Sequence, residues 1–291
     1  MNRDLVLATL ALGSCGAATW SAGWIFRAPG GDRDGTEGDR AGHALERASW
    51  RRLWSPLFPA ALALAVLIGW GLQEPGETDE LLRPLAALAI APFALIWLRA
   101  AWRAAWALRP PARPPLAATV GVVRPRVQLA ERLRRDLDDD QLAAVLAHEE
   151  AHVRHHDPLR LWLAQLATDL QWPNPAARAR LRDWQSSLEL ARDEDARRTG
   201  IAGEDLAAAI VATARLDGHR REEALAYLTG AEHELVDRVR RLLAPLSTTT
   251  EAGRRVLFTS VAVVAATLLL SLLAGFRFGD SLIRALPIIM T

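Results

Sequence analysis

The pentapeptide HEEAH at positions 148–152 contains the residue types that a hydrolytic metal site needs. Residues four apart project from the same face of a helix, so His148 and His152 can present two imidazoles to one ion. Glu149 would lie beside that ion, where its carboxylate can take a proton from water and pass it to a leaving amine. The spacing therefore indicates a zinc peptidase site with Glu149 as the base. The alternative is a polar helix face on which these side chains are merely solvated.

A shifted pair, His152 and His156, has the same four-residue spacing. Val153 stands where that pair would need its glutamate, so a site built on it would lack the base. The chain has one cysteine, Cys15, which excludes cysteine zinc clusters and an intrachain disulfide. Any zinc must therefore be bound by histidines and carboxylates.

A catalytic zinc site also needs a third protein ligand and an open position. Glu189 and Asp193 lie four residues apart in the segment SLELARDEDA, on a predicted helix. Glu189 can ligate zinc while Asp193 hydrogen-bonds a ligand histidine from behind. The same spacing fits a solvated acidic face paired with neighbouring arginines, and the sequence leaves both interpretations open. The candidates for stabilising an oxyanion are His219, His233 and the arginines at 238–241.

The elements that must position these residues have clear local signals. Asp138 followed by Gln141 has the spacing of a capping box, and Pro158 marks the exit from the helix that carries the motif. Residues 119–129 (TVGVVRPRVQL) are β-branched around an Arg-Pro pair, which predicts a short strand or hairpin. From 129 to 243 the pattern of apolar residues is helical.

Four apolar stretches have about the 20 residues that cross a hydrocarbon core; they are 5–26, 54–72, 84–108 and 256–276. The arginine-rich loops place the N-terminus outside, and 28–53 and 109–255 inside, by the positive-inside rule. The first stretch could instead be a cleaved signal peptide, or part of a lipoprotein box ending at Cys15.

The expected fold class is therefore mainly α, a multi-pass membrane protein with four transmembrane helices and a cytosolic helical zinc-peptidase domain that contains a short β-hairpin. Its regions would be a membrane part, the peptidase domain, a fourth membrane helix and a short outer tail, at 1–108, 109–255, 256–276 and 277–291. The net charge of +1 argues against direct nucleic-acid binding.

The motifs together resemble the BlaR/MecR-type membrane metallopeptidases, the antirepressor class of gluzincins. The resemblance rests on five segments, which are in chain order GVVRPRVQLAERL at 121–133, QLAAVLAHEEAHVRHHDPL at 141–159, WPNP at 172–175, ELARDEDA at 189–196 and LVDRVRRLL at 235–243. It covers about 109–245, together with three apolar segments before that region and one after it.

The resemblance implies zinc bound by His148, His152 and Glu189, with Glu149 as the base. Asp193 would stand behind the ligands, and so would Asp157, for which the sequence itself offers no catalytic role. The implied location is the bacterial cytoplasmic membrane, with the peptidase domain in the cytosol. The lipid bilayer and a protein substrate would be its partners.

One departure from the family concerns the residues after the last apolar stretch. The sensor-transducers carry a penicillin-binding domain there, whereas only 277–291 follow in this sequence. We therefore expect no β-lactam sensing by this chain, and a separate sensor protein as a partner. The expected activity is cleavage of a protein at the cytosolic face, with a transcriptional repressor as the substrate that the family implies. The alternatives are a quality-control protease for membrane proteins and a non-catalytic adaptor with a degenerate zinc site.

Overall fold

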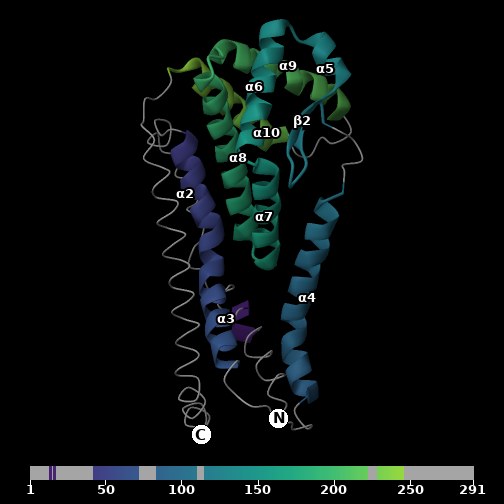
Figure 1. Ribbon diagram of the computed structural model, residues 1–291, viewed down its shortest axis with the longest axis vertical. Coiled ribbons are helices and arrows are strands. Elements are labelled where there is room, and N and C mark those ends of the chain that lie inside the picture. Colours follow the sequence, from purple (N-terminus) through teal and green to yellow (C-terminus); the bar gives the residue numbers. More distant parts are fainter. Residues whose placement is uncertain are drawn as a thin grey trace.

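A computed structural model describes residues 13–14, 16–17, 42–71, 83–109, 115–221 and 228–245. Helices account for most of these residues, and one two-stranded sheet accompanies them, which confirms the mainly α class with a small hairpin (Figure 1). The apolar stretch 5–26, apart from residues 13–14 and 16–17, lies outside the described residues. So do the stretch 256–276 and the tail 277–291.

Within residues 42–71 and 83–109, helices and a 3-10 turn precede the hairpin. They are α2 (Gly42–Trp54), η1 (Ser55–Leu57), α3 (Phe58–Gly71) and α4 (Arg83–Ala107). In Figure 1, α3 and the lower part of α4 extend below the other helices, and α4 packs against α7 (Asp157–Leu170). The helix α2 continues upward from α3 along α8 (Pro175–Arg198).

Most of the predicted span 54–72 lies in α3, which follows the end of α2 and η1, and most of the span 84–108 lies in α4. Within the described part of the chain, no helix combines the length and the hydropathy that crossing a bilayer requires. The helix α3 has 14 residues. On α4, Arg99 and Arg103 both pair with Asp169, at 3.0 and 2.9 Å.

The predicted hairpin is confirmed. Its strands β1 (Ala117–Val120) and β2 (Arg126–Leu129) pair antiparallel. The chain leaves β1 at Gly121, where φ is +98° and a Cβ would lie 2.5 Å from the Arg124 carbonyl oxygen. Only glycine fits that position readily, which is why the turn can be so tight.

The helices that follow the hairpin are α5 (Glu131–Asp136), α6 (Asp139–Arg154), α7 (Asp157–Leu170), α8, α9 (Gly203–Arg221) and α10 (Leu228–Leu243). The N-cap predicted for α6 is confirmed, because the Asp138 carboxylate accepts a hydrogen bond from the Gln141 amide at 2.8 Å. Between α6 and α7 the chain turns at His156, whose φ is +53°. Histidine is among the non-glycine residues enriched in this left-handed region.

In the described part of the chain, two hydrophobic clusters hold the helices together. One joins the hairpin, α5, α6, the C-terminal end of α8, α9 and α10 around Leu133, Val145 and Leu206. The other joins α2, α7 and α8 around Trp184, which is fully buried, with Leu53 and Leu188. Because α6 borders the first cluster and α8 the second, the face where these two helices meet lies between two packed cores.

Candidate metal centre

The three predicted ligands lie together where α6 faces α8. The Nε2 atoms of His148 and His152 are 3.1 Å apart, as expected for side chains one helical turn apart. Glu189 of α8 places its two carboxylate oxygens 3.4 Å from the His148 Nε2 and 3.8 Å from the His152 Nε2. The packing of α8 against α6 thus brings a carboxylate to the two histidines. Glu189 was interpreted either as a zinc ligand or as part of a solvated acidic face, and this geometry fits a ligand.

The spacing of these atoms fits a metal ion. Tetrahedral zinc with bonds of about 2.0–2.2 Å holds its ligand atoms roughly 3.3–3.6 Å apart. The ligand atoms of His148, His152 and Glu189 all lie within 4.8 Å of one another. Both histidine side chains are 11% exposed, whereas that of Glu189 is 33% exposed. The group is therefore enclosed by protein on the histidine side and accessible beside the carboxylate.

Asp193 supports His148 from behind. It lies one turn beyond Glu189 on α8, and its Oδ1 is 3.0 Å from the His148 Nδ1. Arg238 of α10 donates two hydrogen bonds to the Asp193 carboxylate, at 2.9 and 2.8 Å. A third nitrogen of Arg238 lies 3.1 Å from Glu189. This arginine thus holds the ligand carboxylate and the supporting carboxylate in one geometry.

Asp157 lies behind His152 and forms a hydrogen bond with it. Its Oδ2 lies 2.8 Å from the His152 Nδ1. Asp157 follows His152 by five residues, and in a continuous helix the two side chains would point in different directions. The left-handed backbone at His156 separates α6 from α7 and brings Asp157 back to the His152 ring. Arg192 donates to both oxygens of the buried Asp157 carboxylate, and Arg160 donates to one of them at 3.0 Å.

Charges around the imidazoles favour a cation between them. Burial by itself lowers the pKa of His148, but hydrogen bonds and charges from Asp193 and Glu189 outweigh it and raise this pKa to about 10. Burial would raise the pKa of Glu189, yet the hydrogen bond to His148 and the charge of Arg238 hold it well below its usual range. The site therefore stabilises positive charge, which a proton or a metal ion can supply.

Glu149 is buried beside this group and is held by β1. The Thr119 hydroxyl lies 2.9 Å from the Glu149 Oε2 and 2.9 Å from the Glu149 carbonyl oxygen. It therefore fixes the carboxylate relative to its own backbone. Residues 119–129 were predicted only as a strand or hairpin, and no local signal marks Thr119 as a partner of Glu149. The contact arises because the hairpin packs against α6.

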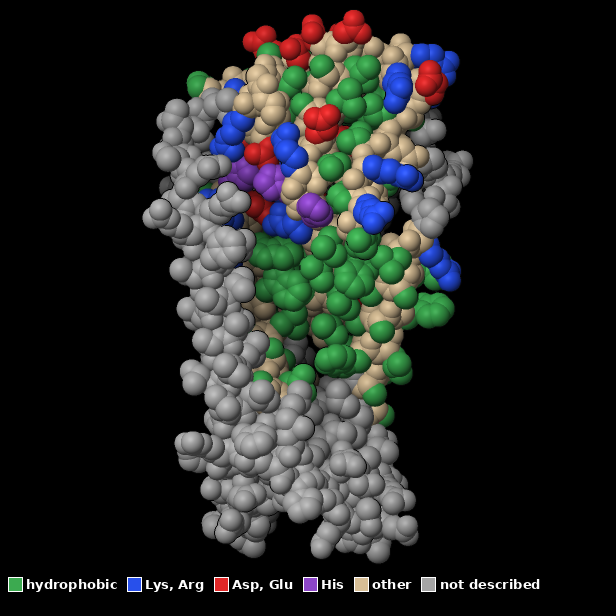
Figure 2. Space-filling view, viewed as in Figure 1, with side chains coloured by type: hydrophobic (Ala, Val, Ile, Leu, Met, Phe, Trp, Pro, Cys, Tyr) green, Lys and Arg blue, Asp and Glu red, His purple; other side chains and the backbone are tan. Residues whose placement is uncertain are grey.

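The other histidine candidates fall elsewhere. His156 is exposed and has left-handed backbone, so the shifted pair of His152 and His156 does not share a helix face. His155 pairs with Asp195 at 3.0 Å, away from the ligand atoms. The side chains of His219 and His233 lie outside the described residues. On the face seen in Figure 2, the histidines gather where a charged upper region meets a broad apolar one.

Comparison with protein families assigns this region. Residues 115–242 match the family described as BlaR1 peptidase M56. This region is an M56 peptidase domain. M56 enzymes are metal-dependent, and the matched range contains all three members of the metal group with the carboxylates behind them. The helix α2 lies before the M56 domain. Neither the curated proteins nor the solved structures give a significant match to the chain.

Proposed function

We propose that the protein is a zinc-dependent endopeptidase that cleaves a protein substrate at the cytosolic face of a membrane. The observation that carries the proposal is the juxtaposition of Glu149 with the enclosed group of His148, His152 and Glu189. A buried carboxylate held by one hydroxyl beside two imidazoles is the arrangement that metal-assisted peptide hydrolysis needs. Two imidazoles and one carboxylate are also the ligand types of catalytic zinc sites.

Bound zinc would supply Lewis-acid polarisation of water and of the scissile carbonyl. His148, His152 and Glu189 would hold the ion, and the Glu189 side chain, 33% exposed, keeps the site in contact with solvent. The Glu149 carboxylate accepts a proton from the attacking water and then delivers it to the leaving amine nitrogen. The Thr119 hydroxyl keeps that carboxylate in position during both transfers.

The direct test replaces the base and compares it with its neighbour. In Glu149→Gln, cleavage of a quenched fluorescent peptide library should fall by about 10²–10⁴-fold, while one equivalent of zinc stays bound. Glu150→Gln is the matched control, because it makes the same chemical change at an adjacent, exposed position. Unchanged cleavage in Glu149→Gln would exclude the assignment.

The substrate is addressed by comparing protein N-termini in cells that express wild type or Glu149→Gln. We propose a transcriptional repressor as the substrate, so one new terminus within a DNA-binding protein is the expected result. Scattered termini in many membrane proteins would instead indicate quality control. No difference, in a protein that retains zinc, would indicate a non-catalytic adaptor.

We also propose that the peptidase is held at the bacterial cytoplasmic membrane and receives its signal from a separate sensor protein. Supporting features are the apolar stretches at 5–26 and 256–276 and the exposed apolar side chains of α4, which include Leu95, Leu98 and Trp102. The protein should stay with membranes after carbonate extraction. Protease should digest 115–242 in inverted vesicles and spare it in intact cells; the opposite accessibility would overturn the orientation.

A further inference from the structure

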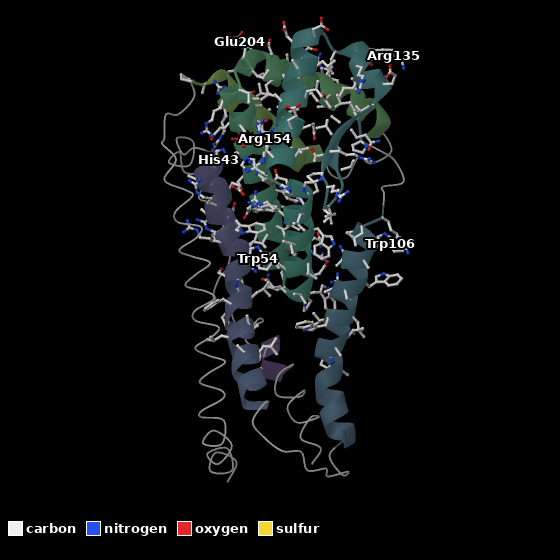
Figure 3. The ribbon with its side chains drawn as sticks, in the orientation of Figure 1. His43, Trp54, Trp106, Arg135, Arg154 and Glu204 are labelled. Atoms are coloured by element: carbon white, nitrogen blue, oxygen red, sulfur yellow. The ribbon has the colours of Figure 1, made fainter. Side chains whose placement is uncertain are left out.

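The helix α2 lies outside the M56 domain and packs along α8, the helix that bears Glu189. His43, near its N-terminus, pairs with Asp195 at 2.9 Å, and Ser49 lies 2.6 Å from the Ser187 hydroxyl. A Cβ at Gly42 would lie 2.8 Å from the Leu190 carbonyl, so the two backbones approach closely there. Figure 3 labels His43 and Trp54, which mark the two ends of this contact.

Within this contact α2 supplies two groups that hold Arg160. The buried Glu46 carboxylate accepts a hydrogen bond from Arg160 Nη2. The guanidinium carbon lies 5.0 Å from the ring centre of Trp50 on α2 and 5.6 Å from that of Trp184 on α8. Cation–π contacts and a carboxylate together fix the position of this guanidinium.

The other side of Arg160 faces the metal centre. Its Nη1 donates to Asp157 at 3.0 Å, and Asp157 contacts the His152 Nδ1 at 2.8 Å. Asp157 therefore forms ion pairs with two arginines, Arg160 and Arg192. The charge of Arg160 is in turn neutralised by Glu46. Without Glu46, the positive charge of Arg160 would no longer be neutralised and would act more strongly on the Asp157 carboxylate. Asp157 would then be a weaker hydrogen-bond acceptor for the Nδ1–H of His152. A less polarised imidazole is a poorer metal ligand.

We propose that Glu46 is a positioning residue for the metal ligand His152, and that docking of α2 thereby sets the metal affinity of the peptidase domain. The inference rests on the proposed function only in taking zinc as the ion. In this proposal α2, a helix outside the M56 domain, contributes to the metal centre of that domain.

The test uses the full-length protein and the variant Glu46→Gln, which keeps an oxygen for Arg160 and removes the charge. Zinc affinity, measured by competition with a chromogenic chelator, should fall by about 5–10-fold, less than the 10–100-fold typical of direct outer partners. Glu204→Gln is the matched control, because Glu204 is an exposed glutamate on α9. Its zinc affinity should equal that of wild type. Trp50→Leu is a second variant, for the case in which Glu46→Gln fails to fold. It removes the cation–π contact with Arg160 and should also lower the zinc affinity.

A second background separates positioning from general destabilisation. In Asp157→Asn the route from Glu46 to His152 is already broken, so adding Glu46→Gln should cause little further loss of zinc affinity. The same 5–10-fold loss in both backgrounds would overturn the inference, and so would wild-type affinity in the single variant.

The outcomes also separate this inference from the proposed function. Zinc binding by wild type without any peptide cleavage would defeat the peptidase assignment and leave the role of Glu46 standing. Intact cleavage together with unchanged zinc affinity in Glu46→Gln would defeat the role of Glu46 alone. Absence of zinc binding by wild type would overturn both.

Discussion

A carboxylate lies within 3.0 Å of the Nδ1 atom of each ligand histidine, but the residues that hold the two carboxylates differ. His148 contacts Asp193, which is held by the partly exposed Arg238. His152 contacts Asp157, whose two arginine partners are Arg192, fully buried, and Arg160. Asp193 and Arg238 of the first support belong to the M56 domain, whereas the second support includes Glu46 of α2, which pairs with Arg160.

This difference shows that two carboxylates, each beside the imidazole of a metal ligand, can contribute unequally to the stability of the fold. Both carboxylates orient an imidazole, so their removal should weaken metal binding alike. Only the Asp157 network buries several charges that depend on one another. Variants of the two carboxylates should therefore separate metal affinity from stability.

The largest expected effect is on stability. Asp157→Ala leaves Arg192, whose side chain is 1% exposed, without its main partner, which should lower the free energy of unfolding by about 3–5 kcal/mol. Asp193→Ala should lower it by less, because Arg238 is more exposed and keeps Glu189 as a partner. Urea unfolding of the metal-free proteins measures both values. An equal or smaller loss for Asp157→Ala would contradict the comparison.

The next effect is on metal affinity. Asp157→Asn and Asp193→Asn keep the size of each side chain but weaken its pull on the imidazole. Each should reduce zinc affinity by about 10–100-fold in a chelator competition. Glu150→Gln, exposed on α6, provides the control. If only one of the two variants changed the zinc affinity, the idea that both carboxylates strengthen metal binding would be wrong.

A pH dependence distinguishes the His148 side. The pKa of His148 is raised to about 10, so in the metal-free protein this ring is protonated at pH 7–9, and zinc must displace that proton. Zinc affinity should therefore rise about tenfold per pH unit in this range, with about one proton released per ion. Calorimetry in buffers of different ionisation enthalpy counts the proton. An affinity that stays constant from pH 7 to 9 would refute this assignment.

The smallest effect concerns the base. Thr119→Val removes the hydrogen bond to Glu149, worth about 1 kcal/mol, and kcat should fall roughly fivefold with KM and zinc content unchanged. Thr119→Ser keeps the hydroxyl and should restore most of the rate. Equal rates for the valine and serine variants would show that the hydroxyl has no part in positioning the base.

Local features were predictable from the sequence because local spacing generates them. The Asp138 cap and the hairpin each depend on residues only a few positions apart, and both are confirmed. The predicted membrane crossings at 54–72 and 84–108 are not supported by the described helices, whose apolar composition does not reach the required level over sufficient length. Asp157 could not be given a role from its spacing, because its contact with His152 depends on the backbone reversal at His156.

The sequence by itself determined that His148 and His152 share a face with Glu149 beside them, because the pitch of one helix fixes that geometry. Tertiary structure alone decided that Glu189 faces the imidazoles, a choice that its spacing had left open. It also decided the partners Thr119, Arg238 and Glu46, since each belongs to a different element packed around α6 to α8. Such contacts join residues far apart in the chain, and no local pattern records which distant side chains packing will bring together.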